Sequence, residues 1–369
     1  MPHQRTIAAI VSRLLKWYPK HARDLPWRRT TDPYCVYVSE VMLQQTQVKT
    51  VIPYWERWLR ELPTVRALAE AEPDRVLKLW EGLGYYHRAR NLQKAARCIM
   101  EQHGGRFPEN YEAILALPGI GRYTAGAICS IAFNQPVPIL DGNVIRVLAR
   151  VFCLRGDPAK RAVQLTLWGL AGQLVNAAGK FRSVGPELPL ANCHSFLNQS
   201  LMELGALVCT PRQPQCSACP IQPQCLACQH GLTDQLPAIP VRAKPIQRRH
   251  IVLLLARKGR LLIHRRPAGG VNDGFWQFPE FEAAPKAVID APFVLQQSGF
   301  QLRNLAKVAN TAHSITRYRL RLEAFRGILQ VSDFPSGPDW RWVARRELES
   351  LPFSAAHRKL LLKLDGWPL

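Results

Sequence analysis

Helical spacing of apolar residues dominates the first two thirds of the chain. The first such segment has apolar side chains three or four positions apart, at Ile7, Ile10, Val11, Leu14, Leu15 and Tyr18. Similar spacing recurs around 54–62, 73–80 and 85–103, and again from 142 to about 176. We therefore expect residues 1–228 to form one mainly helical region.

Alternation of apolar and charged residues replaces helical spacing near the C-terminus. In the segment 318–325 every second residue is apolar, which is the pattern of a half-buried strand. Two more strands are predicted at 250–256 and 260–265, and helices at 286–297 and 354–364. A separate α/β domain is thus predicted over 249–369. The segment 229–248, where prolines alternate with basic residues, reads as an extended linker.

The charge balance narrows the class of partner. The chain of 369 residues has 49 basic and 27 acidic residues, a net charge of +22, which favours a polyanion such as nucleic acid. No apolar run is long enough to span a membrane, and the N-terminus lacks the apolar core of a signal peptide. We expect a cytoplasmic protein without membrane contacts.

A glycine-rich turn joins two of the predicted helices. Gly119 and Gly121 lie in Pro118-Gly-Ile-Gly121, between apolar-spaced segments at 111–117 and 124–133. Backbone N–H groups without neighbouring Cβ atoms can approach a phosphate at a helix N-terminus. An ordinary corner between two helices would show the same local pattern.

Two carboxyl groups in unlike surroundings can divide the work of acid–base catalysis, and Glu40 and Asp141 are the candidates for such a pair. Glu40 is flanked by apolar residues of a predicted helix, which would raise its pKa and keep it protonated. Asp141 follows the apolar Ile139-Leu140. One carboxyl can then protonate a leaving group while the other stabilises positive charge. Taken alone, Glu40 could equally be a solvated helix residue.

The motifs resemble those of a known enzyme superfamily. The hairpin Leu117-Pro-Gly-Ile-Gly121 with Asp141 behind it resembles the helix-hairpin-helix DNA glycosylases. Within that superfamily the stretch 39–48, Ser-Glu-Val-Met-Leu-Gln-Gln-Thr-Gln-Val, is similar to the MutY family of adenine glycosylases, as are Leu25-Pro-Trp-Arg28 and Leu83-Gly-Tyr85. This resemblance covers residues 5–228.

The resemblance implies a fold, a reaction and a partner. It implies a helix-hairpin-helix glycosylase fold with an iron–sulfur cluster loop, followed by a Nudix-like α/β domain. The expected reaction is base excision repair of double-stranded DNA, in which adenine mispaired with 8-oxoguanine or guanine is flipped out and hydrolysed from its sugar. The expected form is a monomer that is associated with the nucleoid in the cytoplasm of a bacterium. The alternatives are a glycosylase of this fold with another opposite-base preference, and a non-catalytic DNA-binding redox sensor.

Catalytic roles carry over residue by residue. Glu40 would protonate the adenine and assist water, and Asp141 would stabilise the sugar cation, with Tyr123 and Asn143 beside it. Related lyases have a lysine at the place of Tyr123. Because a phenol cannot form an imine with the sugar, the resemblance implies a glycosylase without lyase activity.

Binding roles carry over in the same way. The base pocket would be lined by Leu25, Trp27, Arg28 and Gln199. Gln45 and Tyr85 would enter the gap left in the double helix, and Arg88, Gly119 and Gly121 would contact DNA. For Trp27 and Tyr85, ordinary core packing is the competing interpretation.

Cysteines crowd into one short segment. The spacing Cys209-x6-Cys216-x2-Cys219-x5-Cys225 is that of the 4Fe-4S loop in this family, and the loop 209–228 would hold that cluster. Cys228 completes a rival set of four with Cys216, Cys219 and Cys225, which could bind zinc.

The C-terminal domain resembles the Nudix-like domain that reads 8-oxoguanine in this family. Phe275-Trp-Gln-Phe-Pro-Glu280 is similar to the start of a Nudix motif, but the metal-binding acidic helix is missing. Hydrolysis of nucleoside triphosphates is therefore not expected. The family's Phe-Ser-His loop is replaced here by Thr311-Ala-His313, so His313 and Ser314 are the candidate contacts to the opposite base.

Overall fold

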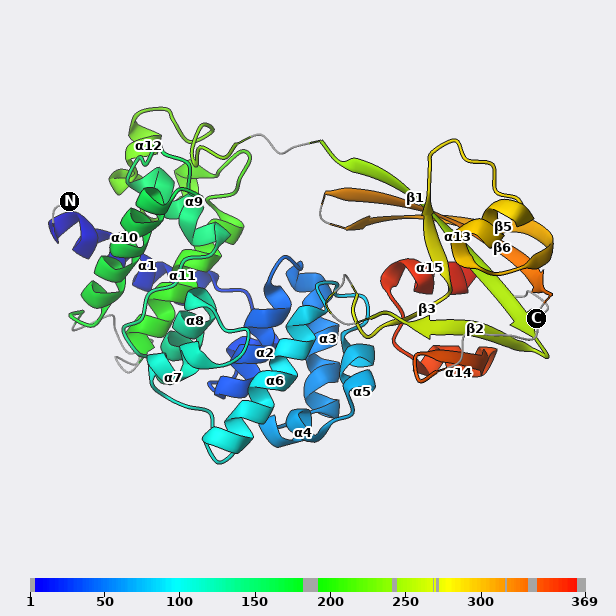
Figure 1. Ribbon diagram of the computed structural model, residues 1–369. Helices are drawn as coiled ribbons and strands as arrows, with labels where there is room; N and C mark the ends of the chain where they lie inside the picture. The colour runs from blue at the N-terminus through cyan, green and yellow to red at the C-terminus, as the bar shows by residue number, and fades with distance from the viewer. Residues whose placement is uncertain are drawn as a thin grey trace. The chain divides into compact units, whose positions relative to one another are not determined.

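The computed structural model describes residues 4–181, 192–240, 244–267, 269, 272–315, 317–330 and 337–363 (Figure 1). Its contacts divide the chain into two compact units. The first comprises Met1–Glu70 and Asn91–Val241, and the second comprises Ala71–Arg90 and Arg242–Leu369. The domain limits expected from sequence, at 228 and 249, remain a prediction.

Helices make up the first unit, as predicted. Its elements are α1 (Gln4–His21), η1 (Pro26–Arg28), α2 (Pro33–Leu43), α3 (Val48–Glu61), α4 (Val65–Glu70), α6 (His87–Gln102, whose first four residues belong to the second unit), α7 (Tyr111–Ala116), α8 (Arg122–Phe133), α9 (Gly142–Val151), α10 (Arg161–Ala178), α11 (Cys193–Leu207), η3 (Cys216–Ala218), η4 (Gln222–Gln224) and α12 (Leu226–Gln229). None of the described helices is both long and apolar enough to cross a membrane.

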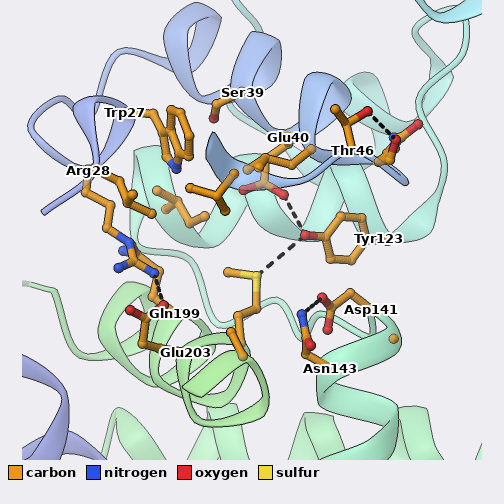
Figure 2. Close-up of a pocket in the computed structure, with 18 of the residues that line it drawn as sticks. Trp27, Arg28, Ser39, Glu40, Thr46, Tyr123, Asp141, Asn143, Gln199 and Glu203 are labelled. Carbon is orange, nitrogen blue, oxygen red and sulfur yellow. Dashed lines mark hydrogen bonds and ion pairs between the residues drawn. The ribbon is translucent and has the colours of Figure 1, made fainter. Parts of the chain in front are cut away.

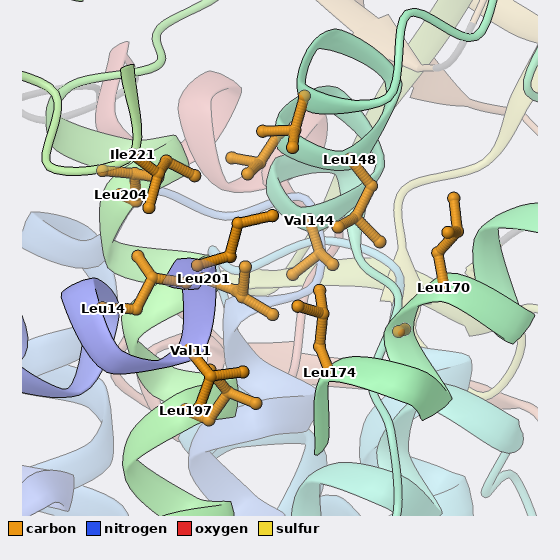
Figure 3. Packing of buried hydrophobic residues seen from close by; sticks show 14 of the residues in the cluster. Val11, Leu14, Val144, Leu148, Leu170, Leu174, Leu197, Leu201, Leu204 and Ile221 are labelled. Atoms are coloured by element: carbon orange, nitrogen blue, oxygen red, sulfur yellow. The ribbon is translucent and has the colours of Figure 1, made fainter. Parts of the chain in front are cut away.

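A large apolar core fixes the helices that carry the site. Val11 and Leu14 of α1 pack with Val144 of α9 and Leu197 of α11, and all four side chains are fully buried (Figure 3). Burying a side chain of this size contributes about 1.5–3 kcal/mol. The cluster therefore sets the N-terminus of α9 and one face of α11 relative to each other.

Aspartate caps begin two of these helices. Asp32 accepts hydrogen bonds from the backbone N–H groups of Tyr34 and Cys35 at the start of α2, with Pro33 in the first turn. Asp141 caps α9 by accepting from the N–H of Val144 at 2.7 Å. Each cap satisfies backbone donors that have no partner within the helix.

A mixed sheet forms the body of the second unit. Its strands are β1 (Ile246–Arg257), β2 (Arg260–Arg265), β3 (Trp276–Gln277), β4 (Glu280–Ala283), β5 (Leu302–Ile315), β6 (Tyr318–Leu329) and β7 (Trp340–Ala344). The order is β3-β2-β1-β6-β5, with β4 on β1 and β7 on β2. β1 and β6 run parallel, whereas the other pairs are antiparallel. The helices are α5 (Pro73–Trp80), α13 (Ala291–Ser298), α14 (Arg345–Ser350) and α15 (Ala355–Lys363).

Alternate residues of β1 enter two separate apolar clusters. Val252 and Leu254 pack with Leu360 of α15, while Leu253 and Leu255 pack with Val294 of α13. Since successive side chains of a strand point to opposite faces, helices cover the sheet on both sides. The predicted α/β character of this region is confirmed.

Candidate active site

One cavity of about 720 Å³ in the first unit collects nine of the residues predicted from sequence. These are Leu25, Trp27, Arg28, Glu40, Gln45, Tyr123, Asp141, Asn143 and Gln199. They come from η1, α2, α8, α9 and α11 and from the turns beside them (Figure 2). The candidate catalytic and base-pocket residues thus meet at a single site.

Glu40 lies on α2, which forms one side of the cavity. The residue is 5% exposed, and the phenol of Tyr123 donates a 2.5 Å hydrogen bond to its Oε2. Burial raises the pKa of Glu40 to about 7, although the hydrogen bond from Tyr123 acts against this rise. A carboxyl group of this kind exchanges a proton near neutral pH, which suits a general acid.

Asp141 is held by hydrogen bonds in the same cavity. Its Oδ1 caps α9, and its Oδ2 accepts from the side-chain amide of Asn143 at 3.0 Å. Burial raises the pKa of Asp141 above its usual value, and the hydrogen bonds from the N–H of Val144 and the Asn143 amide offset only part of this rise. Donors of this kind favour the carboxylate, so the two acids of the cavity have different partners.

Arg146 also lines the cavity and connects this arrangement to the cysteine loop. Its guanidinium donates to Oδ1 of Asn143 at 2.8 Å and to the backbone oxygen of Cys209 at 2.7 Å. Asp141 is thereby connected, through Asn143 and Arg146, to the first cysteine of the predicted cluster loop. Arg146 was not predicted from the sequence, although it lies four positions after Gly142 on the same helix.

A buried carboxylate organises the opposite wall. Glu203 of α11 has a fully buried side chain and accepts from Arg23 and Arg28, each at 2.8 Å. Burial alone would raise its pKa, but the bonds from the two arginines hold the pKa of Glu203 at about 2. Sequence reasoning missed Glu203. The available signal was its spacing of four residues from Gln199, which puts both on one helix face.

Trp27 and Gln199 are fixed by other contacts. The Trp27 ring lies edge-on to Trp55, with centroids 6.1 Å apart, and the residue is 6% exposed. Oε1 of Gln199 accepts from the Tyr18 phenol at 2.9 Å, and its Nε2 donates to Ser195 Oγ at 3.0 Å. The cavity therefore has an aromatic wall and polar groups already oriented.

The hairpin between α7 and α8 has the geometry that its glycines predict. Gly119 has a φ of +77°, and a Cβ there would lie 2.4 Å from Cβ of Asn91, so the position requires glycine. Gly121 is the N-cap of α8, and a Cβ there would meet nothing within 4 Å. This helix N-terminus is open to an anion.

Three further predicted residues line a different cavity. Tyr85, His313 and Ser314 surround a space of about 460 Å³ within the second unit. His313 is half-buried, and burial lowers its pKa. Thr311, which stands where the family motif has Phe, is buried in the sheet and 8% exposed. The expected DNA contact Arg88 is also buried, at 4% exposed, and donates to backbone oxygens instead.

Five thiols surround a third, small cavity between α9 and the loop after α11. They are Cys209, Cys216, Cys219, Cys225 and Cys228. The buried Arg150 donates to Sγ of Cys209 at 3.3 Å. Among the described residues, however, no group of three or more His, Cys, Asp or Glu side chains is arranged to hold a metal ion.

Two family models match the chain. The model of the "HhH-GPD superfamily base excision DNA repair protein" matches residues 38–173, and a NUDIX domain matches residues 250–363. A helical glycosylase fold followed by a Nudix-like domain is therefore confirmed.

Curated relatives and solved structures agree with these matches. The human adenine DNA glycosylase is 35% identical over 98% of this chain and 74% of its own length. The adenine DNA glycosylase of Buchnera aphidicola (from Acyrthosiphon pisum) is 34% identical over 75% of each chain. A thermostable thymine-DNA glycosylase superposes with a TM-score of 0.52 at 29% identity, covering 61% of this chain and 98% of its own. An endonuclease III–DNA complex shares the fold, with a TM-score of 0.50, 21% identity and coverage of 63% and 100%. From its sequence and its fold, this chain belongs to the adenine DNA glycosylase family.

Proposed function

We propose that the protein hydrolyses the N-glycosidic bond of adenine in double-stranded DNA, where adenine is mispaired with 8-oxoguanine or guanine. The observation that carries this proposal is the pair of unlike acids in one cavity. Glu40 is buried with a pKa of about 7, and Asp141 accepts two hydrogen bonds at a helix N-terminus. The relatives named adenine DNA glycosylase support the choice of base.

The cavity offers a place for an extruded adenine. A base must leave the helix before its glycosidic carbon can be reached. Leu25 and Trp27 would contact the faces of the purine, and Arg28 would meet its polar edge. The ion pair with Glu203 holds the Arg28 guanidinium in place, so its orientation does not have to be set when the base enters.

The chemistry follows from the two acids. Protonated Glu40 would transfer its proton to a ring nitrogen of the adenine, and the bonding electrons would leave with the neutral base. The Asp141 carboxylate would stabilise the positive charge that develops on the sugar. A water molecule would then add to the sugar carbon and return its proton to the Glu40 carboxylate. Tyr123 would orient Glu40 through the hydrogen bond between them.

The nature of Tyr123 supports hydrolysis without strand cleavage. A covalent imine with the sugar needs an amine, and a phenol cannot supply one. Tyr123 is partly buried, lies against Glu40 and is 3.5 Å from Sδ of Met202, and desolvation of the phenol raises its pKa well above the usual value. It therefore stays a neutral hydrogen-bond donor.

A 4Fe-4S cluster would be held by Cys209, Cys216, Cys219 and Cys225. The helix-hairpin-helix glycosylases related to endonuclease III are broadly associated with iron–sulfur clusters. The fit is supported by the shared cavity of these thiols and by the Arg150 guanidinium beside Cys209, which would stabilise thiolate charge. The cluster would supply covalent ties that hold the loop after α11. Cys228 lies in the same cavity, so the alternative set of four thiols that includes it, which would bind zinc, is tested alongside the cluster.

The opposite base would be read in the second unit. His313 and Ser314 offer donors and acceptors beside Tyr85 in one cavity. Burial lowers the pKa of His313 and so favours the neutral ring, which can donate from one nitrogen while accepting at the other. We expect these groups to favour 8-oxoguanine over guanine.

The test is excision from duplexes that differ only in the base opposite adenine. Release of adenine opposite 8-oxoguanine and guanine, but not from an A:T pair, is the expected result. Binding of DNA without base release would favour the redox-sensor alternative. A monomeric state and a cytoplasmic, nucleoid-associated location stay predictions.

A further inference from the structure

A strained turn carries the side chain proposed to enter the DNA helix. After α5 ends at Trp80, Gly82 and Gly84 adopt φ values of +103° and +69°, and Tyr85 adopts +47°. The left-handed region is costly for a residue with a Cβ, so Tyr85 holds it only if its surroundings impose it. Tyr85 is nevertheless 39% exposed, so packing of its own ring imposes little.

Arg88 contacts this turn from beneath. Its Nη2 donates to the backbone oxygens of Leu83 at 3.2 Å and Gly84 at 3.1 Å, and its Nε donates to that of Tyr85 at 3.4 Å. The guanidinium also lies 5.1 Å from the centre of the Trp80 ring and 5.5 Å from that of Tyr85. Trp80 adds a bond from its Nε1 to the same Gly84 oxygen at 3.0 Å.

These contacts define what Arg88 does. Three successive carbonyl groups point at one cation, an arrangement that the planar, multiply donating guanidinium suits and a lysine ammonium does not. Arg88 is only 4% exposed, so a phosphate has little access to its guanidinium. The expectation that Arg88 contacts DNA directly is therefore not supported by its position.

We propose that Arg88 is a positioning residue that holds the turn 82–85 in its left-handed form and so presents Tyr85 ready to enter the DNA helix. The inference rests on the proposed function of Tyr85 as the residue that fills the gap in the stack. Because the turn is already ordered in the folded protein, the entropy of ordering it is lost on folding and does not weaken DNA binding.

The experiment is a double-mutant cycle. Arg88→Met, Tyr85→Ala and the double variant are compared with wild type in single-turnover excision of adenine at saturating enzyme. Insertion is followed separately by the fluorescence of 2-aminopurine placed beside the mispair. Arg97→Met is the matched control, because Arg97 of the same helix donates to a backbone oxygen, that of Ala69, outside the turn.

We expect Arg88→Met and Tyr85→Ala each to slow excision about tenfold and to reduce the fluorescence change, with the double variant no slower than the slower single variant. Arg97→Met should behave as wild type in both assays. The slope of affinity against salt should be unchanged in Arg88→Met, since no phosphate contact is lost. Arg88→Lys keeps the positive charge but loses the planar set of guanidinium donors. It should therefore be intermediate in both excision rate and fluorescence change. It also serves as the test variant if Arg88→Met unfolds, as judged by circular dichroism.

Three results would overturn the inference. Additive effects of the two substitutions would mean that Arg88 does not act through Tyr85. A salt slope reduced by about one in Arg88→Met would make Arg88 a phosphate contact. Normal fluorescence and excision in Arg88→Met and Arg88→Lys would leave Arg88 with no role in presenting Tyr85. If Tyr85→Ala itself has no effect, the wedge role fails together with the inference built on it, whereas adenine excision through Glu40 would stand.

Discussion

The Tyr123 phenol and the Glu40 carboxyl group are joined by a 2.5 Å hydrogen bond inside a cavity that also contains Asp141. Two opposing influences act on Glu40. Burial favours its neutral form, and the donor on Tyr123 favours its charged form. The outcome, a pKa of about 7, puts the proton transfer of Glu40 within the physiological range.

Excision should fall as pH rises through about 7. The folded-state pKa of Glu40 lies above its usual value of 4.5, so the protonated form is the one the folded protein favours. Both the acid catalyst and this contribution to stability are present at low pH and are lost as pH rises through about 7. Single-turnover rates from pH 5 to 9 measure this fall, which is the alkaline limb of the pH–rate profile. A rate that is constant across pH 7 would contradict the role of Glu40 as the acid.

Tyr123→Phe should move that alkaline limb to higher pH. The phenol lowers the pKa of Glu40, so its removal leaves burial unopposed and raises the pKa further. The maximal rate should drop about tenfold because Glu40 loses its orienting partner. Tyr111→Phe, in the half-exposed α7, is the control. A limb that stays in place or moves to lower pH would show that the hydrogen bond does not set this pKa.

The cysteine loop makes a compositional prediction. Purified protein should contain about four irons per chain and absorb in the visible range. Cys225→Ser should lose iron, whereas Cys228→Ser should keep it, since Cys228 is outside the proposed ligand set. Iron and zinc are measured by elemental analysis. Zinc in place of iron, or iron lost only from the Cys228 variant, would assign the ligands differently.

His313→Ala should narrow the preference for 8-oxoguanine over guanine by about one power of ten, the value of one hydrogen bond in a site of this kind. Excision opposite guanine should persist, because Glu40 and Asp141 are unchanged. Thr311→Val provides the control, as Thr311 is buried in the same strand. The ratio of excision rates is measured at fixed salt, and an unchanged ratio would remove His313 from the reading of the opposite base.

Local patterns predicted the residues of the site that lie in distinctive motifs. The apolar spacing around Glu40 indicated its burial, and the turn at Gly119 and Gly121 indicated two helices with an open N-terminus. The glycosylase resemblance then assigned Asp141, whose place in the same cavity depends on the packing of α9. The burial of Glu40 and the turn at Gly119 and Gly121 depend on neighbours along the chain, which is why the local sequence was informative for them.

Other features depend on distant partners or broken periodicity. Glu203 meets Arg23 and Arg28, which lie 180 and 175 positions away in sequence. Arg88 was predicted to contact DNA. Its hydrogen bonds to the backbone oxygens of the turn form only when the turn adopts its folded conformation, so the sequence did not indicate them. The strand β5 was not predicted, because two irregularities in its pairing, between Arg303 and Ala306 and between Lys307 and Ala309, break the alternation of its side chains.

The most direct test of adenine hydrolysis by this cavity is the single-turnover release of adenine opposite 8-oxoguanine by wild type and Glu40→Gln. The amide keeps the size of the acid and still forms hydrogen bonds, but its N–H groups are far too weakly acidic to protonate the base. We predict that Glu40→Gln binds the mispaired duplex with affinity close to wild type and releases adenine at least a thousandfold more slowly, the order expected when a general acid is removed. Release within tenfold of wild type, in protein shown to be folded, would contradict the assignment of Glu40 as the acid that drives the reaction.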